Sequence, residues 1–227
     1  MVTVAIDGPA GAGKSTVSKI LARRLGLTLV DTGALYRSTA LQAQRAGVDM
    51  QDEAALGRVA QALDVRFEFD GAINRVFLCG EDVSSAIRTP DNSQLASKIA
   101  ALPAVRSWLM ALQRSLADRP PGAVLEGRDI GTVVLPGASA KFFLTASLET
   151  RVRRRYDELV ASGGSPDFEA LLAAESERDR RDSERAIAPL CQAEDATLVD
   201  SSQLSIDEVI EQMVSVVRSC ADGASPS

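Results

Sequence analysis

Short apolar runs alternate with helical patterns over most of the chain. Val2–Ile6 is an apolar run that leads through a glycine-rich stretch into apolar residues at helical spacing from Val17 to Leu25. A second run, Leu27–Val30, precedes a helical pattern over Ala34–Ala46. This alternation is typical of βαβ units and predicts an α/β fold with a parallel core sheet of five strands, covered by helices on both faces. The remaining three strands are predicted at Ala123–Leu125, Lys141–Leu144 and Thr197–Val199.

One stretch in the middle of the chain has a different period. Apolar and charged residues alternate from Val65 to Phe69, and the same period returns at Val76 and Leu78 after Asp70-Gly71. This pattern predicts a small antiparallel hairpin outside the main sheet. Helical patterns follow at about Asn92–Ala101 and Val105–Ala117, and Pro120-Pro121-Gly122 ends the segment. We therefore expect an inserted subdomain at 63–117, a core domain at 1–62 and 118–220, and a disordered tail at 221–227.

Composition narrows the classes of protein that this chain could belong to. The chain has 227 residues, 45% of them hydrophobic, with a net charge of −6 and no histidine. The negative charge disfavours nucleic acid or a membrane surface as a partner, and the lack of histidine excludes a Ser-His-Asp triad. Three widely spaced cysteines suit neither a disulfide framework nor a zinc site, and no signal peptide or membrane-spanning segment is evident. We expect a cytoplasmic protein, with a monomer as the default state.

The glycine-rich stretch matches Gly-x-x-x-x-Gly-Lys-[Ser/Thr] between a predicted strand and a predicted helix. Glycines there let backbone N–H groups turn toward phosphate oxygens at a helix N-terminus. Lys14 would reach the β and γ phosphates, Ser15 would ligate Mg²⁺, and Thr16 would bind the α-phosphate. The alternative is an ordinary helix cap. The candidate residues of this loop for binding a nucleoside triphosphate are Gly8, Pro9, Ala10, Gly11, Ala12, Gly13, Lys14, Ser15 and Thr16.

Arginines cluster in the second half of the chain. Eight of the 21 arginines lie between Arg151 and Arg185. The sequence contains no Asn-Lys-x-Asp segment, which a GTPase would need to bind guanine. If Glu169–Arg185 is helical, Arg178, Asp182 and Arg185 share one face, which could bind phosphate and ribose. A solvated, salt-bridged helical hairpin is the alternative. We expect residues 151–185 to form a helical lid over a triphosphate.

Four segments of this sequence resemble the nucleoside monophosphate kinases, and within them the bacterial cytidylate kinases. The resemblance spans nearly the whole chain, and it implies a three-layer P-loop kinase fold with an NMP-binding insert and a helical lid. Glu126 stands where this family often has Asp, and Thr32 where it often has Ser. The four segments are Ile6–Ser15, Asp31–Arg37, Glu126–Thr132, and Glu177–Asp179 with Asp182, Arg185 and Ala188–Leu190.

The resemblance also implies roles for individual residues. It assigns the cytosine edge to Ser97, Arg106 and Asp129, and the ribose and its surroundings to Tyr36, Arg178 and Asp182. It assigns the acceptor phosphate to Thr32, Arg37, Arg128 and Arg185, and the transferring phosphoryl group to the lid residues Arg151, Arg154 and Arg155. The candidate catalytic residues are Lys14, Arg128, Arg154 and Arg185.

The implied reaction is in-line phosphoryl transfer with Mg²⁺ from ATP to CMP, and to dCMP. It needs no general base, because the attacking oxygen belongs to a phosphate that is mostly dianionic at neutral pH. Two alternatives stay open at this point. The acceptor could be UMP, AMP or a small metabolite, or the chain could be a non-catalytic nucleotide-binding regulator.

Overall fold

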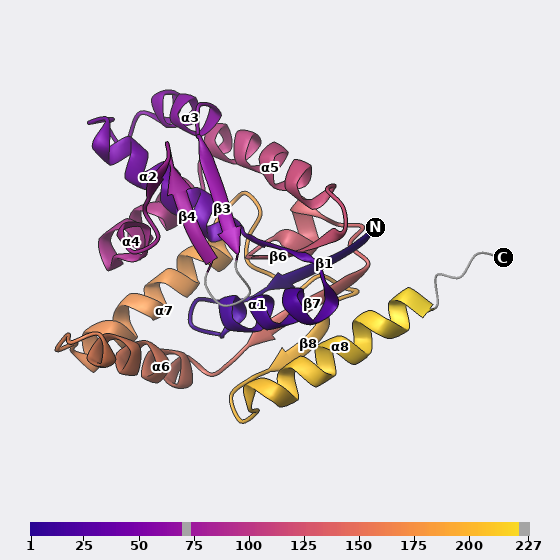
Figure 1. Cartoon of the computed structure of the whole chain (residues 1–227). Helices are drawn as coiled ribbons and strands as arrows, with labels where there is room; N and C mark the ends of the chain where they lie inside the picture. The colour runs from indigo at the N-terminus through magenta and orange to yellow at the C-terminus, as the bar shows by residue number, and fades with distance from the viewer. Residues whose placement is uncertain (70–73, 223–227) are drawn as a thin grey trace.

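The computed structural model of the protein describes residues 1–69 and 74–222. Within these residues the main sheet has five strands in the order β2-β6-β1-β7-β8, and each neighbouring pair is parallel (Figure 1). The predicted α/β fold and each of its five core strands are confirmed. The strands are β1 (Val2–Asp7), β2 (Thr28–Asp31), β6 (Gly122–Gly127), β7 (Ala140–Thr145) and β8 (Thr197–Asp200).

Helices cover both faces of this sheet and make three layers. Helices α1 (Lys14–Leu25) and α8 (Ile206–Asp222) pack on the face that carries Val4 and Ile6. Helix α5 (Pro103–Ala117) and the short helix η2 (Ile130–Val134) pack on the opposite face, which carries Ala5. Because the central strands are buried on both faces, their sequences are continuously apolar rather than alternating.

The carboxyl ends of three strands meet at one edge of the sheet. Asp7 of β1 is in register with Gly127 of β6, and Glu126 of β6 is in register with Asp31 of β2. The loop after β1 requires glycine at its start, because a Cβ on Gly8 would lie 1.9 Å from the Leu144 carbonyl oxygen. Ligands of open parallel α/β sheets bind beyond such carboxyl ends.

The insert contains a second sheet, which is antiparallel. Strands β3 (Val65–Phe69) and β4 (Asn74–Leu78) pair as predicted, while the Asp70-Gly71 turn predicted between them lies outside the described residues. A two-residue strand, β5 (Glu81–Asp82), pairs with β4 and was not predicted. The short helix η1 (Ala86–Arg88) and helix α4 (Pro90–Ile99) then lead to α5.

The predicted boundary at residue 63 does not coincide with a boundary in packing. Helix α3 (Glu53–Gln61), which we did not predict, packs so closely on α5 that a Cβ on Gly57 would lie 2.9 Å from the Cβ of Ala104. Helices α2 (Thr32–Arg45) and α3 also share one hydrophobic cluster with α4 and α5. Residues before 63 thus pack with the insert, and its boundary at residue 63 stays a prediction.

The predicted lid is a pair of helices that projects from the lower left of the molecule in Figure 1. It consists of α6 (Leu148–Ala161) and α7 (Phe168–Glu184), which pack against each other. The helix predicted over Glu169–Arg185 is confirmed except for its last residue, and the Arg185 N–H still donates to the Arg181 carbonyl oxygen as in a helix. Helix α7 ends at Glu184, and Arg185 has an extended backbone, with ψ 138°.

The C-terminal tail is described only in part. Helix α8 continues through Ala221 and Asp222, and the rest of the tail that we expected to be disordered lies outside the described residues. In the described part of the chain, no single helix is long and apolar enough to cross a membrane. Helices α4 and α5 meet those criteria only when taken together, and a bend of 98° separates them.

Candidate functional site

The predicted nucleotide-binding loop, Gly8–Thr16, connects β1 to the first turn of α1. Lys14 is the first residue of α1, and its buried side chain turns back over the loop, where Nζ donates to the Pro9 carbonyl oxygen at 2.7 Å. Burial, with a contribution from the nearby Arg128 guanidinium, lowers the pKa of Lys14 well below its ordinary value. An anion at this site would offset both effects, as expected for an amine that binds phosphate.

Two of the predicted lid arginines reach this loop. Arg151 is buried, and it donates to the Ala10 carbonyl oxygen at 3.1 Å and to Asp179 of α7 at 2.6 Å. Arg154 donates to the carbonyl oxygen of Ser201, which follows β8, at 2.7 Å. The lid is therefore tied both to the loop and to the edge of the core sheet.

Arg155, the third lid arginine predicted at the site, contacts its own helix. It donates to Glu158, less than one turn along α6, at 3.2 Å. Arg153 lies over the Phe168 ring of α7, with 4.7 Å between the guanidinium carbon and the ring centroid. Some arginines at the start of α6 thus contact the nucleotide-binding loop, and others contact side chains within the pair α6 and α7.

Glu126, which we did not predict as a site residue, contacts the predicted metal ligand. The Ser15 hydroxyl donates to Glu126 Oε2 at 2.9 Å. Burial, and next the negative charge of Asp31, raise the pKa of Glu126 to about 7, against an opposing effect of Lys14. A clue in the sequence was that Glu126 ends an apolar strand directly before Gly127-Arg128-Asp129.

The raised pKa of Glu126 predicts how stability depends on pH. Between an ordinary value of 4.5 and the folded value of about 7, the folded protein keeps a proton that the unfolded chain has lost. The free energy of unfolding should therefore fall as pH rises through this window, by about 2–3 kcal/mol from this group. Urea unfolding at about pH 5 and about pH 8 measures the difference, and Glu126→Gln should reduce it. An unchanged difference in Glu126→Gln would contradict the assignment.

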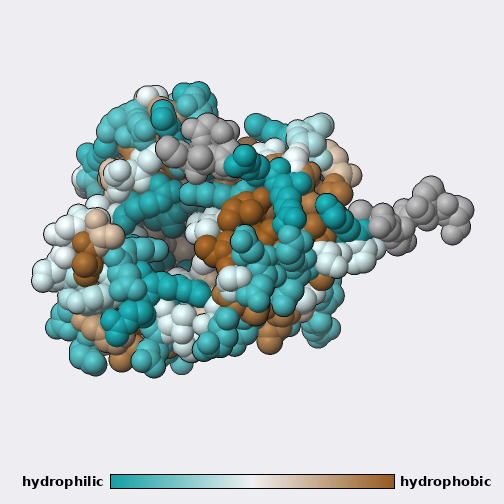
Figure 2. All heavy atoms as spheres, turned by 60° about the horizontal axis from the view of Figure 1, so that its bottom comes forward, coloured by the Kyte–Doolittle hydropathy of each residue, from teal (hydrophilic) through white to brown (hydrophobic). Residues whose placement is uncertain are grey.

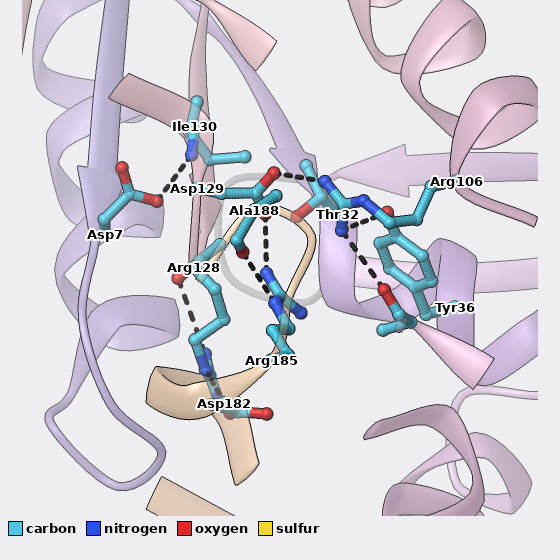
Figure 3. Close-up of polar contacts among 12 residues, drawn as sticks. Asp7, Thr32, Tyr36, Arg106, Arg128, Asp129, Ile130, Asp182, Arg185 and Ala188 are labelled. Carbon is cyan, nitrogen blue, oxygen red and sulfur yellow. Dashed lines mark hydrogen bonds and ion pairs between the residues drawn. The ribbon is translucent and has the colours of Figure 1, made fainter. Parts of the chain in front are cut away.

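The predicted cytosine-reading residues Arg106 and Asp129 form a buried ion pair (Figure 3). Asp129 also accepts a hydrogen bond from Arg185 at 3.2 Å, so one carboxylate holds two guanidinium groups. Arg106 donates to the Ala100 carbonyl oxygen at 3.2 Å and lies 3.5 Å from the Tyr36 hydroxyl oxygen. Arg185, which we assigned to the acceptor phosphate, thus lies with the cytosine-reading group in this structure.

Ser97, the third predicted cytosine-reading residue, lies with the ribose-binding group. Its hydroxyl donates to Asp182 Oδ1 at 3.1 Å. Arg128 Nε donates to the other carboxylate oxygen of Asp182, Oδ2, at 2.9 Å (Figure 3). Arg178 lies close by, and its Nε is buried without a hydrogen-bond partner among the described residues. Burial and the charge of Arg128 lower the pKa of Arg178 to about 10, so this pair of cations would favour a bound anion.

The predicted phosphate-binding residues at the start of α2, Thr32 and Arg37, contact the carboxyl ends of β6 and β2. Arg37 donates to both carboxylate oxygens of Asp31, at 2.9 and 3.1 Å, while its buried Nε has no partner in the described part of the chain. Thr32 donates through its hydroxyl to the Glu126 carbonyl oxygen at 2.6 Å. A buried N–H without an acceptor is uncommon, and a phosphate oxygen would satisfy it.

Asp7, which we also did not predict as a site residue, joins the two halves of the site. Its two carboxylate oxygens accept from the backbone N–H groups of Ile130 and Gly131, each at 2.7 Å. Burial raises the pKa of Asp7 to about 6, and these two hydrogen bonds oppose the rise. Because Asp7 directly precedes Gly8, it fixes the segment after Asp129 relative to the loop.

The molecular surface has a hollow in the view of Figure 2, with hydrophilic side chains along much of its rim. The predicted site residues lie between the insert, the loop after β1 and α7. Four cationic side chains are close together in this region: Lys14, Arg37, Arg128 and Arg178. A chain of net charge −6 thus concentrates positive charge locally, as the binding of phosphate groups requires.

Comparisons with known proteins agree on one family. The model of the family described as "Cytidylate kinase" matches residues 4–219. The cytidylate kinase of Geobacter sp. (strain M21) is 51% identical over 217 residues, which cover 96% of this chain and 93% of that protein. The cytidylate kinase of Mycobacterium avium is 50% identical, with coverage of 96% and 95%, and that of Vibrio cholerae is 50% identical, with coverage of 95% and 96%.

The fold also resembles a solved structure of low sequence similarity. An uncharacterized protein from Eubacterium ventriosum superposes over 96% of this chain and 99% of its own, with a TM-score of 0.55 and 13% identity. This similarity concerns the fold alone. On the extent of the family match and the identity to its members, the chain belongs to the cytidylate kinase family.

Proposed function

We propose that this protein transfers the γ-phosphoryl group of ATP to CMP, and also to dCMP, and so forms the diphosphates. The observation that carries the proposal is the position of Asp129. Its carboxylate is held by Arg106 and Arg185, while Asp7 ties the segment that follows it to the start of the Gly8–Thr16 loop. One site thus contains both a triphosphate-binding loop and polar groups that suit a pyrimidine edge.

On the donor side, the backbone N–H groups of the loop and Lys14 would bind the ATP phosphates. Arg151 and Arg154 donate to backbone carbonyl oxygens of this loop, at Ala10 and Ala12. From there a modest movement of the lid would bring their guanidinium groups to the transferring phosphoryl group. Arg155 would need a larger rearrangement, because it is paired with Glu158.

On the acceptor side, two buried N–H groups that lack hydrogen-bond partners within residues 1–69 and 74–222 suit the phosphate of CMP. They belong to Arg37 and Arg178, and the charges of Arg128 and Arg37 both act to lower the pKa of Arg178. Asp182, with Ser97 and Arg128 as donors, would hold the ribose. The catalytic effect would come from in-line positioning and from cations that stabilise charge on the transferring group.

Mg²⁺ fits the oxygen donors of this site. The Ser15 hydroxyl and the Glu126 carboxylate lie 2.9 Å apart, and Mg²⁺ is commonly held by one or two protein oxygens together with substrate phosphates. Bound there with ATP, the ion would neutralise charge on the β and γ phosphates. The high pKa of Glu126 is consistent with a carboxylate whose cation is supplied by the ligand.

The test is a coupled phosphotransfer assay with ATP, Mg²⁺ and a panel of acceptors. We expect turnover with CMP and dCMP and a much lower kcat/KM with UMP and AMP, because a hydrogen-bonding site rejects a base that leaves its polar groups unpaired. Fast turnover with UMP or AMP would move the assignment within the nucleoside monophosphate kinases. Nucleotide binding without turnover on any acceptor would favour a regulator and overturn the proposal.

We also propose that the protein acts as a monomer in the cytoplasm and binds no nucleic acid. The negative net charge supports the last point. The three cysteines, Cys79, Cys191 and Cys220, are free and exposed, which suits a reducing compartment. Light scattering after size-exclusion chromatography would measure the oligomeric state.

A further inference from the structure

Helix α4 of the insert and helix α7 of the lid are linked by two polar contacts. The first is the hydrogen bond from Ser97 to Asp182, both of which belong to the proposed acceptor site. In the second, Gln94 Oε1 accepts from both terminal nitrogens of Arg181, at 3.3 Å each. The contact between Gln94 and Arg181 lies next to the first, three residues away on α4 and one residue away on α7.

Gln94 and Arg181 have no role in the site described above. Arg181 also differs from its neighbour Arg180, whose exposed side chain pairs with Glu177 and Glu184 of its own helix. Arg181 instead reaches from the lid to the insert. Two adjacent arginines of α7 thus have different environments, and one of them connects parts of the protein that are distant in sequence.

Helix α7 is connected at another point to the nucleotide-binding loop. Asp179 accepts from Arg151 at 2.6 Å, and Arg151 donates in turn to the Ala10 carbonyl oxygen at 3.1 Å. A continuous set of contacts therefore runs from Gln94 in the insert, through α7, to the loop that would bind ATP. Any change in the position of α7 would move Asp182 and Arg151 together, because one helix carries both Asp182 and Asp179.

We propose that Gln94 and Arg181 are positioning residues, which hold α7 against α4 and thereby couple acceptor binding to donor binding. The pair touches neither nucleotide. It places Asp182 for the acceptor, and through Asp179 it places Arg151 at the loop. This inference rests on the proposed function for the identity of the acceptor, whereas the contact between α4 and α7 stands independently of it.

The test compares Gln94→Ala and Arg181→Ala with the matched control Arg180→Ala. Loss of a hydrogen bond to a charged group at this half-buried position is expected to raise the KM for CMP about three- to tenfold, with a smaller change in kcat. Because both single changes break the same contact, Gln94→Ala/Arg181→Ala should be no worse than either one. Gln94→Glu should keep the KM of the unmodified protein, because its carboxylate can pair with Arg181.

Coupling is measured by calorimetric titration of CMP with and without a non-hydrolysable ATP analogue. The factor by which the analogue tightens CMP binding should fall in Arg181→Ala and stay unchanged in Arg180→Ala. The inference is overturned if Arg181→Ala matches Arg180→Ala in KM and in coupling. Additive effects of the two single changes would also overturn it, since they would show that the residues act separately.

Amide hydrogen exchange without nucleotides separates this inference from the proposed function. Faster exchange in α7 of Arg181→Ala than of Arg180→Ala would support the positioning role even if the unmodified protein failed to phosphorylate CMP. In that case the proposed function would fall while the link between α4 and α7 would stand. Equal exchange in the two variants would count against the link, whatever the activity.

Discussion

Lys14→Ala is expected to lower kcat by about a thousandfold or more while the protein stays folded. Lys14 is the buried cation at the start of α1, and it lies where the β and γ phosphates of ATP would bind. Its loss would remove positive charge that is needed most when charge spreads over the transferring group. Steady-state kinetics with ATP and CMP measure the loss.

The fold should tolerate this change, because burial already opposes the charged form of Lys14. Removal of the amine leaves the Pro9 carbonyl oxygen without its donor, but it also removes a desolvated charge. We expect the Tm to shift by less than about 4 °C. Lys19→Ala, on the same helix, is the matched control. If purified Lys14→Ala kept the rate of the unmodified protein, the assignment of the donor site would be wrong.

Asp129→Ala is expected to have the second largest effect, and to lower both the stability of the fold and the activity with CMP. Asp129 is the common partner of two arginines, and the side chains of Arg106 and Arg185 are each only 6% exposed. Removal of the carboxylate would take away the partner that both buried cations share, at a cost of about 3–5 kcal/mol. Thermal unfolding should record a fall in Tm of about 10 °C, and kcat/KM for CMP should fall at least about a hundredfold.

Asp129→Asn separates the two effects. The amide keeps the volume and an acceptor oxygen but not the charge, so part of the stability should return while discrimination between CMP and UMP stays impaired. Asp118→Ala, which removes an exposed aspartate at the end of α5, is the control. An Asp129→Ala protein with unchanged Tm and an unchanged preference for CMP over UMP would contradict the proposed role.

Most of the core fold could be predicted from the sequence, because its signals are local. The five core strands are short apolar runs, and the helices that follow β1 and β2 have clear amphipathic patterns. Helix α3 was not predicted, although Leu56, Val59 and Ala60 have helical spacing, whereas β5 has only two residues and therefore no detectable period. The end of α7 was misplaced by one residue, which is within the usual uncertainty of a helix boundary.

The candidate site was predicted less completely than the fold. Residues within continuous motifs, such as Lys14 and Arg128, lie in the region where we expected them. Asp7 and Glu126 were missed as site residues, because nothing in their immediate sequence indicates that Asp7 meets the backbone of Ile130 or that Glu126 meets the Ser15 hydroxyl. Those contacts depend on the parallel pairing of β1 with β6.

By itself the sequence predicted the donor half of the site, since eight consecutive residues between a strand and a helix match the motif of a phosphate-binding loop. Only the tertiary structure decided which side chains of the acceptor half contact one another. Asp129 meets Arg106 and Arg185 across 23 and 56 residues of chain, and Ser97 meets Asp182 across 85. The physical reason is that a buried charge takes whichever partner the packing of α5, α7 and β6 brings within reach, and periodicity along the chain does not encode that distance.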